Sequence, residues 1–163
     1  MTNLEPQSES IPINETPIEH QGVLVVDDNE QNLELLHAYL DELGGEVRLA
    51  RDGLEAIESV GKAAPDIILL DIMMPRMSGF QVCEQLKKDP ETRDIPIIMV
   101  TALNEVGDVE RAIDSGADDF LTKPVNKLEL LTRVRSLLRV RQLKRQLDTA
   151  VDEVRSMRDQ TGE

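Results

Sequence analysis

The sequence predicts an α/β fold, in which a doubly wound sheet of five parallel strands carries helices on both faces and an extended helix follows at the carboxyl end. Short apolar runs alternate with stretches of helical periodicity along the 163 residues, and short linkers join them. A repeated strand–helix–strand unit makes its strands parallel and places helices on the faces of one sheet. The chain is long enough for one such domain with an extension.

The central strand is predicted within residues 65–75, which read PDIILLDIMMP. Four apolar residues at 67–70 lead directly into Asp71. An uninterrupted apolar run of this length indicates a strand that is buried on both faces of a parallel sheet. Asp71 would then stand at the carboxyl edge of the sheet, where open α/β sheets bind their ligands.

The part of the chain before the central strand predicts a tail and two strand–helix pairs. Residues 1–21 contain four Glu and neither Lys nor Arg, which predicts a disordered acidic tail. Order is expected to begin at Gly22, and Gly44 and Gly45 are expected to stop the first helix. The expected elements are a strand at 23–26, a helix at 29–43, a strand nearer the edge at 46–50 and a helix at 52–63.

The part after the central strand predicts two further strands and three helices. The expected elements are a helix at 79–88, a strand at 95–100, a helix at 105–115, a short strand at 119–122 and a long helix at 126–157. Gly116 suits a left-handed residue that ends the helix before it. The simplest arrangement of all five strands is the flavodoxin-like order 2-1-3-4-5.

Chemically active side chains follow four of the predicted strands. Asp27 and Asp28 follow the first strand, Asp71 and Thr101 the third and fourth, and Lys123 the fifth. Parallel strands bring these ends to one edge, where three close carboxylates would repel each other and raise at least one pKa. A hard dication with oxygen ligands, Mg²⁺ above all, relieves that repulsion. The set suits phosphoryl transfer, and the alternative is that it only caps helices and forms surface ion pairs.

Four motifs within residues 22–138 resemble the receiver domain of two-component response regulators. They are VLVVDD, DIILLDIMMPRMSG, IIMVTA and DDFLTKP. The resemblance implies that Asp71 accepts a phosphoryl group from a sensor histidine kinase or a phosphotransfer protein. It also implies that the chain is not an enzyme beyond its own phosphorylation and dephosphorylation. The single cysteine, Cys83, separately favours the reducing cytoplasm as its location.

The same resemblance assigns roles to the other site residues. Asp27 and Asp28 match the acidic pair that binds Mg²⁺ together with Asp71, and the backbone carbonyl at Met73 matches a further metal ligand. Thr101 and Phe120 match the two switch residues of the family. Lys123 matches the phosphate-binding lysine, whose peptide bond to the next proline is cis in the family.

Other functions are disfavoured or left open. A haloacid-dehalogenase-type phosphatase also uses an Asp nucleophile on such a sheet, but it needs a second acid where Met73 stands. A dinucleotide-binding oxidoreductase needs a Gly-rich loop after the first strand. The stretch RVRSLLR resembles the region behind the receiver of diguanylate cyclase or HD-type phosphodiesterase regulators. The sequence therefore leaves open whether the chain stands alone or is a truncated part of a larger cyclic-di-GMP-related regulator.

The last helix changes its apolar spacing near Leu138. Before that point Leu128, Leu131 and Val134 suit packing on the sheet. Residues 139–163 form a predicted helical extension with a heptad spacing that predicts a parallel coiled-coil homodimer. Its seam consists of Val140, Leu143, Leu147, Ala150, Val154 and Met157.

Charges beside this seam favour and oppose pairing. Glu153 of one helix could meet Arg158 of the other, whereas Arg139 and Lys144 would repel in the same geometry. The alternative is a single solvated helix, because the seam is shorter than three full heptads.

Composition excludes several classes of protein. The net charge of −14 argues against DNA or RNA binding, which needs a surplus of basic residues. Cys83 is the one cysteine, so no intrachain disulfide forms. No apolar run approaches the ~20 residues that a membrane span needs, and no signal peptide is visible.

Overall fold

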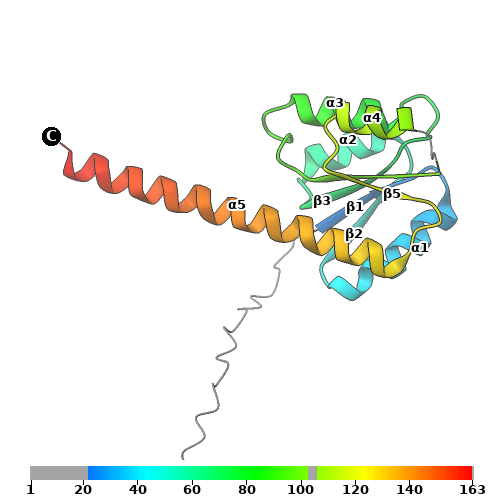
Figure 1. Cartoon of the computed structure of the whole chain (residues 1–163), viewed down its shortest axis with the longest axis horizontal. Coiled ribbons are helices and arrows are strands. Elements are labelled where there is room, and N and C mark those ends of the chain that lie inside the picture. The colour runs from blue at the N-terminus through cyan, green and yellow to red at the C-terminus, as the bar shows by residue number, and fades with distance from the viewer. Residues whose placement is uncertain (1–21, 103–105, 163) are drawn as a thin grey trace, which may run out of the picture.

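The computed structural model describes residues 22–102 and 106–162 and contains the predicted five-stranded sheet (Figure 1). The predicted tail at 1–21 lies outside the described residues. The strands are β1 (Gly22–Val26), β2 (Glu46–Ala50), β3 (Ile67–Asp71), β4 (Ile97–Thr101) and β5 (Asp119–Thr122). All neighbouring strands are parallel, and their order is β2-β1-β3-β4-β5, which confirms the predicted topology.

Helices cover both faces of the sheet. They are α1 (Glu30–Leu40), a short 3-10 turn η1 (Asp41–Leu43), α2 (Gly53–Lys62), α3 (Gly79–Lys88), α4 (Val106–Asp114) and α5 (Lys127–Thr161). Helices α1 and α5 lie on one face, and α2, α3 and α4 lie on the other (Figure 1). Gly44 has a φ of 67°, a value that favours glycine, and it ends the turn that follows α1.

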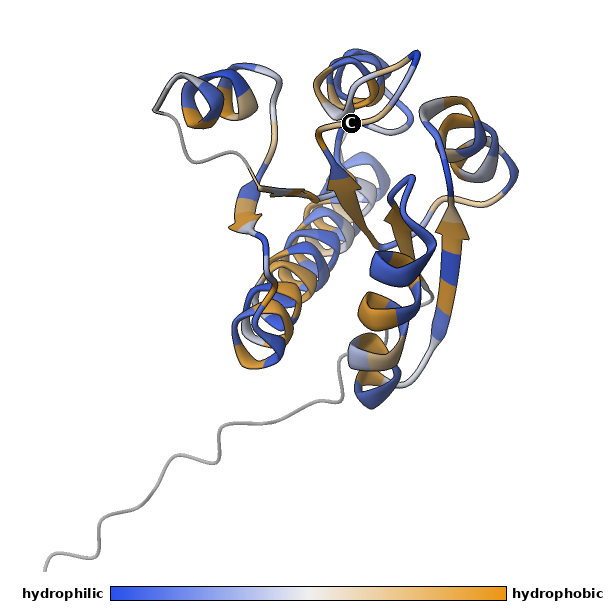
Figure 2. Ribbon diagram, turned by 90° about the vertical axis from the view of Figure 1, so that its right-hand side faces the viewer, coloured by the Kyte–Doolittle hydropathy of each residue, from blue (hydrophilic) through white to orange (hydrophobic). Residues whose placement is uncertain are grey.

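The core consists of two apolar layers separated by the sheet. Every residue of β1, β3 and β4 is buried, because these strands have a neighbouring strand on both sides and helices on both faces. Figure 2 shows the hydrophobic colour concentrated on the strands, while each helix has a hydrophilic side. Edge strand β2 is less covered, and Glu46 at its start is exposed. The continuous apolar runs in the sequence therefore correspond to the central strands.

Helix α5 packs on the sheet with a different set of residues from the one predicted. Leu130, Leu131, Val134 and Leu138 are buried, whereas Leu128 is 73% exposed. The prediction for Leu128 was therefore wrong. Asn126 caps the helix by accepting the N–H of Glu129, which sets where the helix begins. At 100° per residue Leu128 lies about 60° outside the arc that the buried residues occupy.

Beyond Leu138 the helix continues away from the sheet (Figure 1). Its 35 residues correspond to a length of about 52 Å. Large apolar side chains in this part are exposed, and they include most of the predicted seam: Val140, Leu143, Leu147, Val154 and Met157. Among the described residues no helix is both long and apolar enough to span a bilayer.

Candidate functional site

The carboxyl edge of the sheet brings together the acidic residues singled out in the sequence. Asp71 is the last residue of β3, and Asp27 and Asp28 directly follow the neighbouring strand β1. One carboxylate oxygen from each of the three lies within 4.8 Å of the others. Asp27 and Asp71 are buried and Asp28 is exposed, so the cluster is open to solvent on one side. The predicted meeting of these three side chains is therefore observed.

Backbone hydrogen bonds hold the acidic pair in place between β1 and α1. The N–H of Asp27 donates to the carbonyl of Ala50 at 3.1 Å, which ties the pair to the end of β2. A carboxylate oxygen of Asp27 accepts the N–H of Asn29 at 2.9 Å. Asn29 in turn caps α1 by accepting two backbone N–H groups. The turn after β1 thus orients one oxygen of Asp27 and leaves the other for the site.

Lys123 reaches the cluster from the end of β5. Its Nζ lies 3.0 Å from Oδ2 of Asp27 and 3.3 Å from Oδ1 of Asp71. Its backbone N–H donates to the carbonyl of Thr101 at 2.7 Å, and its peptide bond to Pro124 is cis, as the resemblance implies. Burial lowers the pKa of Lys123, but its contacts with Asp27 and Asp71 outweigh this effect, so the net pKa is raised. The ammonium group is therefore charged at neutral pH.

The pKa of Asp71 lies well above the ordinary value for an aspartate. Burial raises its pKa, the negative charge of Asp27 adds to the increase, and Lys123 opposes both, with a net value of about 6. The carboxylate is mostly ionised at neutral pH, yet its charge is held at a cost in free energy. A buried carboxylate of this kind next to a cation is well suited to act as a nucleophile or a metal ligand.

We expect Asp71→Asn to stabilise the metal-free protein by about 2 kcal/mol at neutral pH. The pKa of Asp71 in the folded state is about 6, whereas an unfolded chain gives about 3.9. The folded state therefore binds this proton more tightly than the unfolded state. The charge of Asp71 lowers stability progressively as the pH rises from about 4 to about 6. Asparagine carries no charge and removes this loss.

Urea unfolding in EDTA at about pH 4 and about pH 7.5 measures this effect. The variant should be more stable than the wild type at the higher pH, and the two should converge at the lower pH. A variant that is less stable at the higher pH would contradict the raised pKa of Asp71.

The residues of the cluster fit a hard dication. Three carboxylates with oxygens close together and no soft ligand among them match the preference of Mg²⁺. Burial and the neighbouring charge of Asp27 raise the pKa of Asp71, so a bound cation would reduce the free-energy cost of keeping this carboxylate ionised. Met73, whose carbonyl the resemblance gives as a ligand, lies two residues beyond β3, and its side chain is 64% exposed.

The family follows from a comparison with known protein families. Residues 23–135 match the model of the response regulator receiver domain, which is well over half of the chain. The chain belongs to the response regulator receiver family. The resemblance that the sequence motifs carry is thereby confirmed.

Named relatives are similar to the receiver over one part of their length. Response regulator PleD of Caulobacter vibrioides is 52% identical over 117 residues, which are 72% of this chain and 26% of PleD. The DNA-binding dual master transcriptional regulator RpaA of Synechocystis is 43% identical over 117 residues, which are 72% of this chain and 48% of RpaA. The receiver thus spans between about a quarter and about half of the length of these two relatives.

Solved structures share the fold. The signal receiver domain of a signal transduction histidine kinase from Syntrophus aciditrophicus is 38% identical, with a TM-score of 0.68 over 72% of this chain and 89% of that one. Chemotaxis protein CheY4 of Vibrio cholerae is 30% identical, with a TM-score of 0.69 over 73% of this chain and 99% of that one. These likenesses confirm the predicted fold class.

The two predicted switch residues of the receiver lie on adjacent strands. Thr101 is the last residue of β4 and is buried. Phe120 belongs to β5, is partly buried and packs against the apolar layer that contains α4. Residues 103–105, which follow Thr101, lie outside the described residues. Thr101 thus stands at the acidic edge, and Phe120 lies opposite Met99, two residues before Thr101 on β4. Their role as a switch stays a prediction.

Gly79 is a residue of the receiver site that the sequence reasoning did not single out. Its N–H donates to the carbonyl of Ile72 at 2.9 Å, which holds the start of α3 against the end of β3. An added Cβ at Gly79 would lie 2.2 Å from the backbone oxygen of Asp71. Ser78 and Gln81 form a capping box at this helix start. The Ser-x-x-Gln spacing could have located the helix start, but no local signal reveals the close approach.

An apolar groove of about 380 Å³ lies next to Lys123 of the receiver. Leu35 and Leu36 of α1 form one wall, and Pro124 and Val125 form the other. Leu35 is 44% exposed there. Because Lys123 contacts Asp71, the groove offers a contact surface beside the acidic site.

Proposed function

We propose that this receiver accepts a phosphoryl group on Asp71 from a phosphohistidine and thereby acts as a phosphorylation-dependent response regulator. The observation that carries the proposal is the placement of a buried carboxylate with a pKa of about 6 between two acids and Lys123. A carboxylate of that kind is a nucleophile at neutral pH, and the ammonium group beside it stabilises charge that develops on the phosphoryl oxygens.

The reaction consists of an in-line displacement. An oxygen of Asp71 attacks phosphorus, the P–N bond to the histidine breaks, and its electron pair leaves with the imidazole, which takes up a proton from solvent. Lys123 contacts the attacking carboxylate before transfer and the new phosphoryl group after it. Mg²⁺ held by Asp27, Asp28, Asp71 and the carbonyl of Met73 would supply further positive charge to the phosphoryl oxygens.

The donor is a sensor histidine kinase or a phosphotransfer protein. Such a donor must bring a histidine side chain to the exposed side of the acidic cluster, where Asp28 faces solvent. The apolar groove lined by Leu35 and Val125 lies beside Lys123 and suits the binding of the donor. Membership of the receiver family supports this class of partner.

The consequence of phosphorylation is a change on the face formed by α4, β5 and α5. The phosphate adds close to two negative charges and three strong acceptor oxygens. Thr101 and Lys123 stand at the ends of β4 and β5 and can donate to it. Movement of the Thr101 side chain would free space for Phe120 to turn inward, so that local binding alters a surface of the receiver.

The chain divides into an acidic tail at 1–21, the receiver at 22–138 and a helical extension at 139–163. The helical extension pairs with that of a second copy. Exposure of Leu143, Leu147 and Val154 at heptad spacing supports a parallel coiled coil. The last two pairs of seam positions, from Leu147 onward, lie where the helix extends alone. Phosphorylation would then alter how two receivers are placed on the pair of helical extensions, which is called the stem below.

A second candidate is that the chain is the receiver portion of a larger cyclic-di-GMP-related regulator. The match to PleD covers only 26% of that protein. Helix α5 extends beyond the receiver body, that is, the sheet and the helices packed on it, and a following domain could be attached there. This reading leaves the chemistry at Asp71 unchanged. The length of the encoding gene tests it.

Incubation with acetyl phosphate and Mg²⁺ tests the proposed function, with a phosphomonoester as the competing substrate. The protein should become phosphorylated by acetyl phosphate, and the label should be stable to acid and labile to hydroxylamine, as expected for an acyl phosphate. Turnover of the phosphomonoester without any stable label would favour a phosphatase instead.

A further inference from the structure

The amino edge of the sheet, opposite the acidic site, holds the first turns of the helix beyond Leu138. Arg141 and Arg145 lie 3.7 Å and 3.3 Å, respectively, from Oδ1 of Asp66, which is buried just before β3. The other carboxylate oxygen of Asp66 accepts the N–H of Gly22 at 3.3 Å. Burial and then the neighbouring charge of Arg145 lower the pKa of Arg141, which shows how closely the body covers this side chain.

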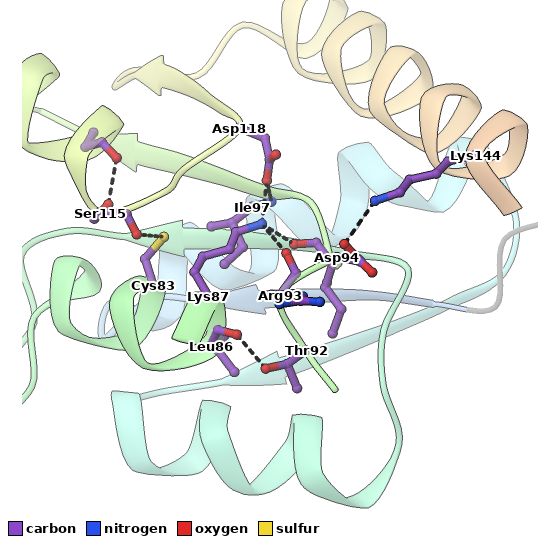
Figure 3. Close-up of polar contacts among 12 residues, drawn as sticks. Cys83, Leu86, Lys87, Thr92, Arg93, Asp94, Ile97, Ser115, Asp118 and Lys144 are labelled. Atoms are coloured by element: carbon purple, nitrogen blue, oxygen red, sulfur yellow. Dashed lines mark hydrogen bonds and ion pairs between the residues drawn. The ribbon is translucent and has the colours of Figure 1, made fainter. Parts of the chain in front are cut away.

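A second contact is made by Lys144, which lies between Arg141 and Arg145 in the chain. Nζ of Lys144 is 3.0 Å from Oδ1 of Asp94, in the loop between α3 and β4 (Figure 3). Lys87 holds this loop by donating to the carbonyls of Arg93 and Ile95 at 3.1 Å and 2.8 Å. The body therefore presents Asp94 at a defined place, and the hydrogen bond from Lys144 lowers the pKa of Asp94.

The body and the exposed apolar seam use different faces of α5. Leu138, Arg141 and Arg145 contact the receiver body and recur at spacings of three and four. The seam residues Val140, Leu143 and Leu147 recur at the same spacings. The two sets are offset by two residues, which corresponds to about 200° around a helix. A second copy can therefore pair along the seam while both helices stay attached to their own receivers.

Lys144 lies at the margin between these two faces. In a parallel coiled coil, the g position of one helix faces the e position five residues later on the other helix. Arg139 is at g and Lys144 is at e, so Arg139 of each copy faces Lys144 of the other, which gives two such contacts per dimer. Two such like-charge contacts oppose pairing. In the structure, however, Lys144 is paired with Asp94 of its own receiver.

We propose that Asp94 permits the two stems to pair by holding Lys144 away from Arg139 of the second copy. The inference rests on the proposed stem pairing and adds the residue of the receiver body that controls it. Stem pairing is then not a property of the helix alone, because a helix separated from its receiver would present both basic side chains at the seam. Glu153 and Arg158 attract each other across the later part of the same seam.

The experiment is a double-mutant cycle on the full chain, with the dimer dissociation constant measured by sedimentation equilibrium at low salt. Asp94→Asn should weaken the dimer by about three- to fivefold, because Lys144 becomes free to repel Arg139. Lys144→Gln should not weaken it, and Asp94→Asn combined with Lys144→Gln should restore it. At about 1 M salt the effect of Asp94→Asn should vanish, since charges are then screened within about 3 Å.

Two outcomes would overturn the inference while leaving stem pairing intact. One is an Asp94→Asn dimer as tight as the wild type at low salt. The other is equal weakening in the single variant and in the double variant, which would show that Asp94 acts through the fold rather than through Lys144.

Two further readouts separate this inference from the proposals on which it depends. Leu147→Asp, at an exposed seam position, should abolish the dimer if the stem is the interface. A wild type that stays monomeric at high protein concentration, with and without acetyl phosphate and Mg²⁺, would overturn stem pairing and this inference together. Phosphorylation of those same samples would show that the chemistry at Asp71 stands independently.

Discussion

Asp71→Asn is expected to abolish phosphorylation of this protein by acetyl phosphate in the presence of Mg²⁺. The amide of asparagine is a far weaker nucleophile than a carboxylate, and it cannot form the acyl phosphate. The neighbouring acids do not replace it, because Asp27 is oriented by the N–H of Asn29 and by Lys123, and Asp28 lies on the exposed side of the cluster. The loss should be complete within the detection limit of a stoichiometric label.

A matched control separates loss of the acceptor from loss of the fold. Asp94→Asn changes an acid at the opposite edge of the sheet and should be labelled as the wild type is. EDTA should block labelling of the wild type, since the three carboxylates then lack the cation that neutralises them. Full labelling of Asp71→Asn would overturn the assignment of Asp71 as the acceptor.

Gly79→Ala is expected to destabilise the protein by about 2–4 kcal/mol and to impair phosphorylation as well. The added Cβ would lie 2.2 Å from the backbone oxygen of Asp71 and 2.9 Å from the Cα of Ile72. These are backbone atoms of the central strand and the turn after it, so no side-chain rotation relieves the clash. Helix α3 would have to move away from β3, which exposes Phe80 and displaces the acceptor.

The chain supplies a matched control at Gly61, the second-to-last residue of α2. A Cβ added at Gly61 would meet no atom within 4 Å apart from its chain neighbours and the backbone of its own helix, and Gly61 is not among the glycines with positive φ. Gly61→Ala should therefore raise stability by up to about 1 kcal/mol through helix propensity. Thermal and urea unfolding of both variants provide the comparison. Equal stability of Gly79→Ala and the wild type would contradict the close approach of α3 to β3.

Sequence patterns were sufficient for the fold and for the meeting of the acidic residues. The runs that became β1, β3 and β4 are apolar throughout, and only strands buried on both faces read in this way. Parallel strands in the order 2-1-3-4-5 then leave little freedom, so Asp27, Asp71 and Lys123 had to meet at one edge. These conclusions depend on local pattern and on topology alone.

Other features depend on contacts between residues far apart in the chain. The heptad pattern indicated a seam, but the rotation of α5 on the sheet follows from its cap and from packing, which is why Leu130 rather than Leu128 is buried. The close approach of Gly79 to Asp71 arises only when α3 docks against β3. The approach of Gly79 to Asp71 has no signature in the residues beside it.

The charges show the same division most clearly. The sequence indicated that a cluster of carboxylates would raise the pKa of at least one of them. The burial of Asp71 and its distance from Lys123 decide that it is the pKa of Asp71 that rises. Likewise, Arg139 and Lys144 predicted repulsion along the stem, whereas the folded chain places Asp94, fifty residues earlier, within 3.0 Å of Lys144. Electrostatic energies depend on distance and on exclusion of water, and both are properties of the packed chain rather than of its order of residues.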